Sequence, residues 1–233
     1  MKMSALLATI STLSLGYANV DAAERPVVVE LFTSQGCSSC PPADLFLTEL
    51  ARNRPDVLAL AFHVTYWNEL GWTDPFSLEA ATQRQSRYAE RFGDGAYTPE
   101  IVVDGRRDVV GSSRSQVNAA IEAAEHANTT LATISVRSTT DGLSIDVGAG
   151  TGNAELLLIG LDSTHQTNVS RGENGGRKLT ESNVVRSITP IGKWHGNPIS
   201  TVVHVPEGED VAAILQTADG AIVGAARARR TSQ

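Results

Sequence analysis

The feature that most constrains this chain is its pair of cysteines, Cys37 and Cys40, the only two among 233 residues. An apolar run over residues 26–32 precedes them and is typical of a strand buried on both faces. Two prolines follow, and leucines then recur at helical spacing, which predicts a helix that begins directly after Cys40. A Cys-x-x-Cys ring closes too short a loop to stabilise the chain much through loop entropy. The pair therefore indicates chemistry or metal binding.

The segments after the cysteines predict an α/β unit. Pro55 ends the expected helix, and the apolar segment 57–64 predicts a second buried strand. Strand, helix and strand in this order form a βαβ unit, with parallel strands and a right-handed crossover. Further elements are expected at 77–91 (a helix that Ser77 caps), at 101–103 and 108–110 (two strands) and from Ser112 or Ser113 to about 127 (a helix).

The composition changes near residue 128, where segments rich in Val, Ile, Leu and Thr begin to alternate with Gly, Asp and Asn turns. These segments lie at 131–137, 143–147, 154–161, 183–189, 201–205, 211–216 and 221–227. Seven short strands with intervening turns predict a small β-sandwich. We therefore expect an α/β domain at 23–128 and a β-rich domain at 129–233.

The first 22 residues have the pattern of a secretory signal peptide. Lys2 precedes an apolar stretch at 5–15, and small residues follow at 17–23. Cleavage before Ala23 and cleavage before Asp21 are both compatible with this pattern, so the exact site is open. We expect a periplasmic or secreted protein, and disulfides persist in those compartments.

Composition excludes several classes of protein. Hydrophobic residues make up 41% and charged residues 19%, so the chain can bury a core. The net charge of −7 supplies no basic field for phosphate backbones, and we expect no nucleic-acid partner. No apolar run reaches the roughly 20 residues that cross a bilayer, so we expect no stable membrane span once the signal peptide is removed.

The position of the cysteines at a helix start predicts thiol–disulfide exchange. Unpaired backbone N–H groups and the positive end of the helix dipole stabilise a thiolate there and lower its pKa. Cys37 is the candidate nucleophile. Cys40, one helical turn further on, would then resolve the mixed disulfide and release reduced substrate.

Metal binding is the main alternative for a lone Cys-x-x-Cys. A zinc site needs about four ligands, and the five histidines are scattered without paired metal spacing, so we predict no zinc site. Two thiolates alone can hold Cu(I), and a copper(I)-binding protein therefore stays an alternative.

The order of these segments resembles the thioredoxin fold, with Thr98-Pro99 at the cis-proline position of that superfamily. The resemblance extends to a family of exported bacterial thioredoxin-like proteins of unknown function, over nearly the whole chain after the signal peptide. The matching segments are 30–44, 63–76, 97–105, 171–177 and 183–186. The resemblance implies a thioredoxin-like α/β domain (a mixed sheet flanked by helices) before the β-rich domain, and an exported redox setting. It implies no substrate.

Pro99 and Thr98 are predicted to dock the substrate. A proline without an N–H and in a fixed turn leaves the backbone of the preceding Thr98 free to pair with an extended chain beside the dithiol. The Ser38-Ser39 pair departs from the residues that thioredoxins and strong Dsb oxidants carry between their cysteines, so the direction of the redox reaction stays open.

Two residues are candidates for proton transfer. The resemblance implies that Glu30, in the first strand, could be a buried acid that accepts the Cys40 proton, whereas strand parity could instead turn it to a solvated edge. His63 ends the second strand, on the edge where the active site is expected, so it could shuttle protons or serve as a hydrogen-bonded structural histidine.

The loop at 65–76 and the segment from Arg171 to Arg186 have less specific patterns. Tyr66, Trp67 and Trp72 could form an apolar wall for substrate, or the loop could simply pack on its own aromatic rings. The charges between Arg171 and Arg186 indicate an ion-pair network between the domains, or a site for an anion or partner.

The leading hypothesis is an exported thiol–disulfide oxidoreductase that acts on protein thiols and disulfides and is recharged by a redox partner. It needs no cofactor beyond the redox-active disulfide of Cys37 and Cys40. The alternatives are the copper(I)-binding protein and an adaptor whose β-rich domain binds a partner while the disulfide is structural. The client and the oligomeric state are open.

Overall fold

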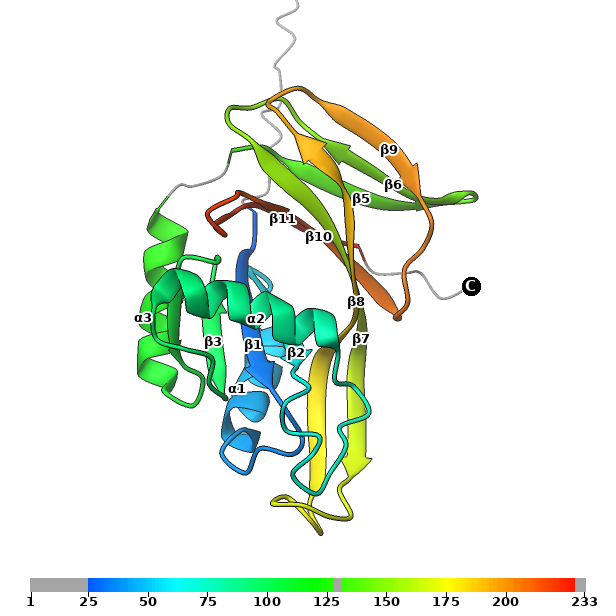
Figure 1. The fold of residues 1–233 in the computed structure, drawn as a ribbon. Coiled ribbons are helices and arrows are strands. Elements are labelled where there is room, and N and C mark those ends of the chain that lie inside the picture. Colours follow the sequence, from blue (N-terminus) through cyan, green and yellow to red (C-terminus); the bar gives the residue numbers. More distant parts are fainter. Residues whose placement is uncertain (1–24, 128–130, 229–233) are drawn as a thin grey trace, which may run out of the picture.

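The computed structural model describes residues 25–127 and 131–228, which form three helices and eleven strands (Figure 1). The first half contains β1 (Val27–Thr33), α1 (Pro41–Asn53), β2 (Val57–His63), α2 (Glu79–Phe92), β3 (Glu100–Val103), β4 (Arg107–Val110) and α3 (Arg114–His126). The second half contains β5 (Ile134–Thr139), β6 (Gly142–Val147), β7 (Ala154–Asn168), β8 (Lys178–Trp194), β9 (Ile199–Val203), β10 (Asp210–Gln216) and β11 (Ile222–Ala228). The predicted mixture of an α/β half and a β-rich half is confirmed.

The centre of the molecule is the parallel pair β1 and β2. Every residue of both strands is buried, as their continuous apolar runs predict. The pair runs in register from Val27 beside Val57 to Thr33 beside His63. Because α1 connects two neighbouring parallel strands, the predicted βαβ unit is confirmed. β3 then pairs antiparallel with β1, and β4 with β3.

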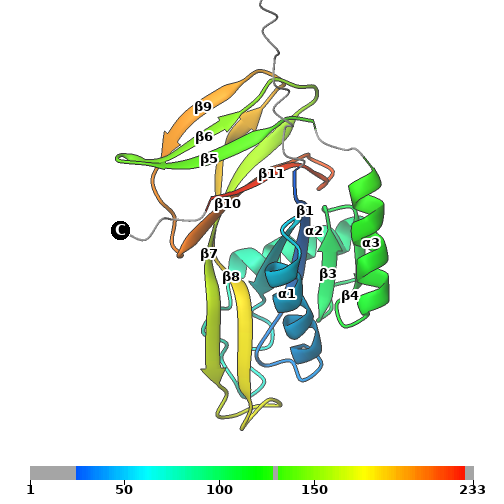
Figure 2. The same ribbon diagram turned by 180° about the vertical axis from the view of Figure 1, so that it is seen from behind.

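The helices cover both faces of this sheet. Along β1, Val29 and Leu31 pack in one core with residues of α1 and α3, whereas Val28 and Phe32 pack in another with residues of α2. Figure 2 shows α1 and α3 on the same side of the strands. Residue parity therefore decides whether a β1 or β2 side chain faces α1 or α2.

The start of α2 differs from the prediction. The helix begins at Glu79, and Leu78 rather than Ser77 is the N-cap. The Ser77 hydroxyl instead donates a hydrogen bond to the backbone oxygen of Asp74, 2.9 Å away. Ser77 therefore closes the preceding loop and does not cap the helix.

The β-rich half does not form a separate sandwich, and this part of the predicted fold needs correction. One eight-stranded sheet runs in the order β11-β10-β7-β8-β2-β1-β3-β4, and only β5, β6 and β9 form a second sheet. β8 joins β2 in parallel at Val184 beside Ala61, and the Asn183 side chain donates to the backbone oxygen of Ala59. Local pattern predicts each strand but not its partner, because pairing depends on residues far apart in sequence.

Alternate residues of the strands in the large sheet pack in two different cores. On β7, Leu157 and Ile159 face the core that α2 covers, whereas Leu156 and Leu158 face the core closed by the three-stranded sheet. A sandwich-like packing is therefore present, but one of its sheets continues into the α/β half. The predicted boundary at 128–129 lies in 128–130, outside the described residues.

The long hairpin of β7 and β8 matters most for the site. It runs along the molecule, and its tip lies at the same end as the segment that leads into α1 (Figures 1 and 2). The predicted signal peptide lies outside the described residues. Within the ranges that the structure does describe, no helix is both long and apolar enough to span a membrane.

Candidate functional site

A disulfide joins Cys37 to Cys40 at the start of α1, which confirms the predicted bond. Cys40 is the N-cap residue and already has helical backbone angles. Its N–H points back to the Cys37 carbonyl, 3.3 Å away. Both cysteines have 0% exposed surface, while Ser38 and Ser39 between them are exposed. The sulfurs therefore lie just beneath the surface, under a turn that faces solvent.

The hydroxyl of Ser39 distinguishes the two sulfurs. Its oxygen lies 3.3 Å from Cys37 Sγ. In the reduced protein, a hydroxyl at this position can donate a hydrogen bond to the sulfur, and a hydrogen bond to the charged form favours a thiolate. A thiolate on Cys37 would therefore have a hydroxyl donor beside it.

Thr98 and Pro99 lie close to this turn. Their peptide bond is cis. The Trp67 indole N–H donates to the Thr98 hydroxyl at 2.9 Å. The same tryptophan packs against Gly36, where a Cβ would lie 3.1 Å from Trp67 Cβ. Trp67 therefore spans the distance between the residue before Cys37 and the residue before Pro99.

The other two aromatic residues of the 65–76 loop make hydrogen bonds of their own. Tyr66 is 42% exposed and donates its hydroxyl to Gln85. Trp72 is half-buried and donates its indole N–H to the Gln35 side chain, 3.1 Å away. The structure thus brings Trp67 and Trp72 against residues directly before Cys37, whereas Tyr66 points to α2.

The tip of the β7–β8 hairpin, residues 169–177, covers the cysteine turn; we call it the covering loop. The Asn174 side-chain amide donates to the backbone oxygens of Gln35 and Cys37, at 3.0 and 2.9 Å. Glu173 accepts a hydrogen bond from the Ser38 N–H. Gly172 has a φ of +74° and packs against Trp72, so this position favours glycine. The segment with the unusual charge pattern therefore makes hydrogen bonds to the backbone of the cysteine turn, including the Cys37 oxygen.

Among the residues that the structure describes, the predicted ion pairs of the 171–186 segment do not join the two halves. Arg186 pairs with Asp162 and Glu207, all within the β-rich half. The polar contacts between the halves at the covering loop are hydrogen bonds, made by Glu173 and Asn174.

A buried group of polar side chains lies on the α1 face of the sheet, at the strand ends that lead into the cysteine turn. We call it the polar cluster: Thr33, Gln35, Asp44, His63, Asp74 and Glu181, all buried. Thr33 donates to Asp44 at 2.8 Å, and His63 Nδ1 lies 2.7 Å from Asp74. Gln35 connects the two ends, since its N–H donates to Asp74 and its side chain to Glu181. His63 Nε2 and Glu181 Oε1 have no hydrogen-bond partner among the described residues.

The cluster has unusual protonation behaviour. Burial, followed by the charge of Glu181, raises the pKa of Asp44 to about 7. Burial alone would lower the pKa of His63, but the charge and hydrogen bond of Asp74 outweigh it and raise that pKa to about 9. Burial also raises the pKa of Glu181. At neutral pH the cluster therefore holds a charged His63–Asp74 pair beside Asp44, whose carboxyl group is near its pKa.

In the part of the chain that the structure describes, no group of three or more His, Cys, Asp or Glu side chains has the arrangement of a metal site.

Glu30 lies elsewhere. Its parity places it on the α2 face, opposite to α1, where its carboxylate pairs with Arg84 at 2.6 Å and accepts the Tyr88 hydroxyl. Both Glu30 and Arg84 are buried, so the alternative that Glu30 lies on a solvated edge is wrong. This geometry therefore provides no contact through which Glu30 could accept the Cys40 proton.

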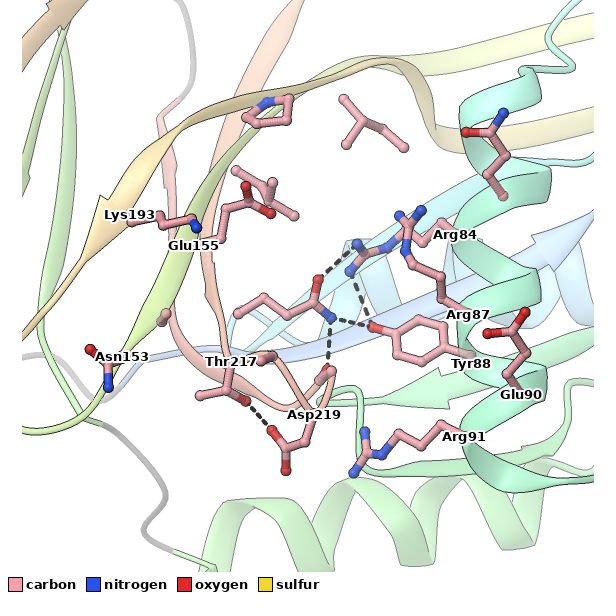
Figure 3. A pocket seen from close by; sticks show the side chains of 18 of the residues that line it. Arg84, Arg87, Tyr88, Glu90, Arg91, Asn153, Glu155, Lys193, Thr217 and Asp219 are labelled. Carbon is pink, nitrogen blue, oxygen red and sulfur yellow. Dashed lines mark hydrogen bonds between the residues drawn. The ribbon is translucent and has the colours of Figure 1, made fainter.

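Arg84 and Tyr88 also line a cavity of about 1010 Å³ between α2 and the β-rich half (Figure 3). Its other charged walls alternate in sign, with Arg87 and Lys193 near Glu90 and Glu155. Gln216 closes the network by accepting from Arg84 and donating to the Tyr88 hydroxyl.

Comparison with protein families assigns the chain to one of them. The model of a family described as "Protein of unknown function (DUF1223)" matches residues 28–223. The chain belongs to the DUF1223 family. The match spans β1 to β11, so both halves belong to the one family unit.

Two solved structures are similar to this DUF1223 protein. Protein AGR_C_4864 of Agrobacterium tumefaciens, known from X-ray crystallography, is 33% identical, with a TM-score of 0.80 over 91% of this chain and 98% of that one. HBP35 of Porphyromonas gingivalis shares the fold at 16% identity, with a TM-score of 0.60 over 88% of this chain and 75% of that one. A search of curated proteins found no match.

Sequence reasoning missed several residues of this DUF1223 site. Asp44 had a usable signal, because it follows Cys40 by four residues and so shares its helix face. Asp74, Asn174 and Glu181 had none, since only the long hairpin and the 65–76 loop bring them to the cysteines. His63 was singled out, and the structure places it in the polar cluster.

Proposed function

We propose that this DUF1223 protein is a thiol–disulfide oxidoreductase. The observation that carries the proposal is the Cys37–Cys40 disulfide at the start of α1, a bond that closes too small a ring to serve mainly as a staple. The reduced pair would lie where the first N–H groups of a helix stabilise a thiolate. Protein thiols and disulfides are the proposed substrates.

A thioredoxin-like fold of the first half is part of this proposal. It is supported by the strand order β2-β1-β3-β4, by the parallel β1–β2 pair, and by two helices on one face with one on the other. Thr98 and Pro99 precede β3 and border α1, because Gly111 packs between Pro99 and Ala43. A client segment beside Thr98 would thus lie next to the sulfurs.

The proposed reaction is a pair of exchanges. The Cys37 thiolate attacks a client disulfide, forms a mixed disulfide and releases the first client thiolate. Cys40 then attacks Cys37 Sγ, which re-forms the Cys37–Cys40 bond and releases the second client thiolate. The client gains two electrons that the dithiol loses, and the reverse sequence oxidises a client dithiol. No cofactor beyond the two cysteines is required.

We also propose that the protein is exported to the periplasm or secreted. The signal-peptide pattern of residues 1–22 supports export, and a disulfide is at home in an oxidising compartment. A redox partner would then have to regenerate one state of the cysteine pair.

One observation favours a second function, that of a partner-binding protein with a structural disulfide. Both cysteines are fully buried, and the covering loop holds their turn through Asn174 and Glu173. A client can reach Cys37 only after this loop moves. Redox behaviour separates the two functions.

The test is a redox titration of purified, metal-free mature protein. The protein is equilibrated in glutathione buffers of graded ratio and its alkylatable thiols are counted, with Cys37→Ser as the control. A midpoint of about −120 to −180 mV marks an oxidant or isomerase, and one near about −270 mV marks a reductant. A disulfide that stays closed throughout the range and exchanges with no thiol overturns the proposal.

A further inference from the structure

Asp44 lies one helical turn beyond Cys40 on the same face of α1. The Asp44 N–H donates to the Cys40 carbonyl at 3.1 Å, so the two residues are related by a regular turn of helix. Side chains four residues apart on a helix have Cβ atoms roughly 6 Å apart. Cys40 is 0% exposed and Asp44 is 5% exposed. The two residues therefore lie one turn apart on the buried side of α1.

The groups around Asp44 come from four other elements. Thr33 at the end of β1 donates its hydroxyl to Oδ1. The titratable groups that act on Asp44 are His63 of β2, Asp74 of the 65–76 loop and Glu181 of β8. One imidazolium thus faces three carboxyl groups. Because one positive charge cannot balance three buried carboxylates, burial favours keeping a proton on the carboxyl groups.

From this geometry we propose that Asp44 accepts the proton of the Cys40 thiol when Cys40 resolves the mixed disulfide. This inference rests on the proposed oxidoreductase function and assigns a residue to its second step. Its electrostatic setting agrees, because burial and Glu181 raise the pKa of Asp44 to about 7, where a carboxyl group can take up and release a proton near neutrality.

The step balances as follows. In the mixed disulfide, Cys37 is bonded to a client sulfur and Cys40 carries a thiol. The thiol proton moves to an oxygen of Asp44, and the Cys40 thiolate attacks Cys37 Sγ. The Cys37–Cys40 bond forms as the client–Cys37 bond breaks, and the electron pair leaves with the client thiolate. The proton on Asp44 then passes to that thiolate or to water.

Thr33 and the His63–Asp74 pair are positioning groups in this scheme. Thr33 donates one hydrogen bond to the Asp44 carboxyl and so restricts its orientation. The positive charge of His63 stabilises the ionised form of Asp44, which opposes the effects of burial and Glu181. Without His63, Asp44 would stay protonated to higher pH and could accept no proton at neutrality.

The experiment follows the two steps separately. The reduced mature protein is mixed with the aromatic disulfide dithiobis(nitrobenzoate). Its coloured thiolate is released once when Cys37 reacts and once more when Cys40 resolves the mixed disulfide. The rate of the second release is recorded against pH for the wild type and for Asp44→Asn. We expect Asp44→Asn to slow this release at least about 10-fold at pH 7 and to remove the inflection that Asp44 gives.

The sign of the effect separates proton transfer from a purely electrostatic role. Removing a nearby negative charge by itself makes a thiol more acidic and its attack faster. An equal or faster second release in Asp44→Asn, with an unchanged pH profile, therefore overturns the inference. The matched control is Glu49→Gln, an exposed carboxylate on the same helix that pairs with Arg114, and its second release should equal that of the wild type.

A second variant keeps the inference testable if Asp44→Asn folds poorly. Thr33→Val keeps the carboxyl group and removes its hydrogen bond, so the inflection in the second release should move to higher pH. An inflection that stays in place contradicts the scheme. Failure of the oxidoreductase function looks different, because the wild type itself would then release no coloured thiolate from Cys37.

Discussion

The covering loop should control how fast the disulfide can be reached, and Asn174→Ala tests this. The Asn174 amide makes two hydrogen bonds to the cysteine turn, to the oxygens of Gln35 and Cys37. Each such bond contributes a net of about 0.5–1.5 kcal/mol, so their loss should cost loop closure about 1–3 kcal/mol. That difference corresponds to a roughly 5- to 150-fold larger open population.

The assay is the rate of reduction of the Cys37–Cys40 disulfide by dithiothreitol at low reductant concentration. If the loop opens and closes faster than reduction, the observed rate follows the open population. Asn174→Ala should therefore be reduced about 5- to 150-fold faster than the wild type. Both reduction rates are measured at urea concentrations well below those at which either protein unfolds.

Arg171→Ala is the matched control, because Arg171 is an exposed residue of the same loop. Its reduction rate should equal that of the wild type. Equal rates for Asn174→Ala and the wild type would refute the gating argument. An equal acceleration in Arg171→Ala would show that general loosening of the hairpin, and not the two hydrogen bonds, sets the rate.

Three further predictions concern stability and are checked by urea unfolding. The pKa of Asp44 is about 7 in the folded protein and near 3.8 when the chain is unfolded. The free energy of unfolding should therefore fall by up to roughly 4 kcal/mol as pH rises between these values. Asp44→Asn should remove this fall. Arg84→Met should cost about 3–5 kcal/mol, because it leaves the Glu30 carboxylate buried and unpaired, yet leave the redox midpoint unchanged. Trp67→Phe should cost about 1 kcal/mol through the lost bond to Thr98.

His63 adds to the expected pH dependence with the same sign. Its pKa is about 9 when folded and 6.5 ordinarily, so its pairing with Asp74 stabilises the folded state fully below pH 6.5. That contribution is lost as pH rises through 9. Because removal of His63 also keeps Asp44 protonated to higher pH, the comparison is made with Asp44→Asn in both proteins. There, His63→Gln should show a smaller fall in unfolding free energy between pH 6.5 and 9.

Local sequence pattern predicted the elements that hold the cysteines because those elements depend on near neighbours. The apolar runs gave β1 and β2, and the prolines after Cys40 together with the spaced leucines gave α1. The same reasoning placed seven strands in the second half. It could not show that β8 pairs with β2, since that contact joins Ala61 to Val184.

The site was predictable only in part, for the same reason. Cys37, Cys40 and His63 sit on elements with clear local patterns. Glu30 was given a role by resemblance, but its parity directs it to Arg84 on the far face. Asn174 reaches Cys37 because β7 and β8 extend well beyond the predicted strands 154–161 and 183–189. A hairpin of that length is set by pairing along its whole course, which no single strand reveals.

The central claim is that Cys37 attacks and Cys40 resolves. It is tested most directly by mixing reduced Cys40→Ser and reduced Cys37→Ser with oxidised glutathione and following adducts by intact-mass spectrometry. The account predicts a stable glutathione adduct on Cys37 in Cys40→Ser and a much slower reaction in Cys37→Ser. Equal rates in the two variants, or no adduct in either, would contradict it.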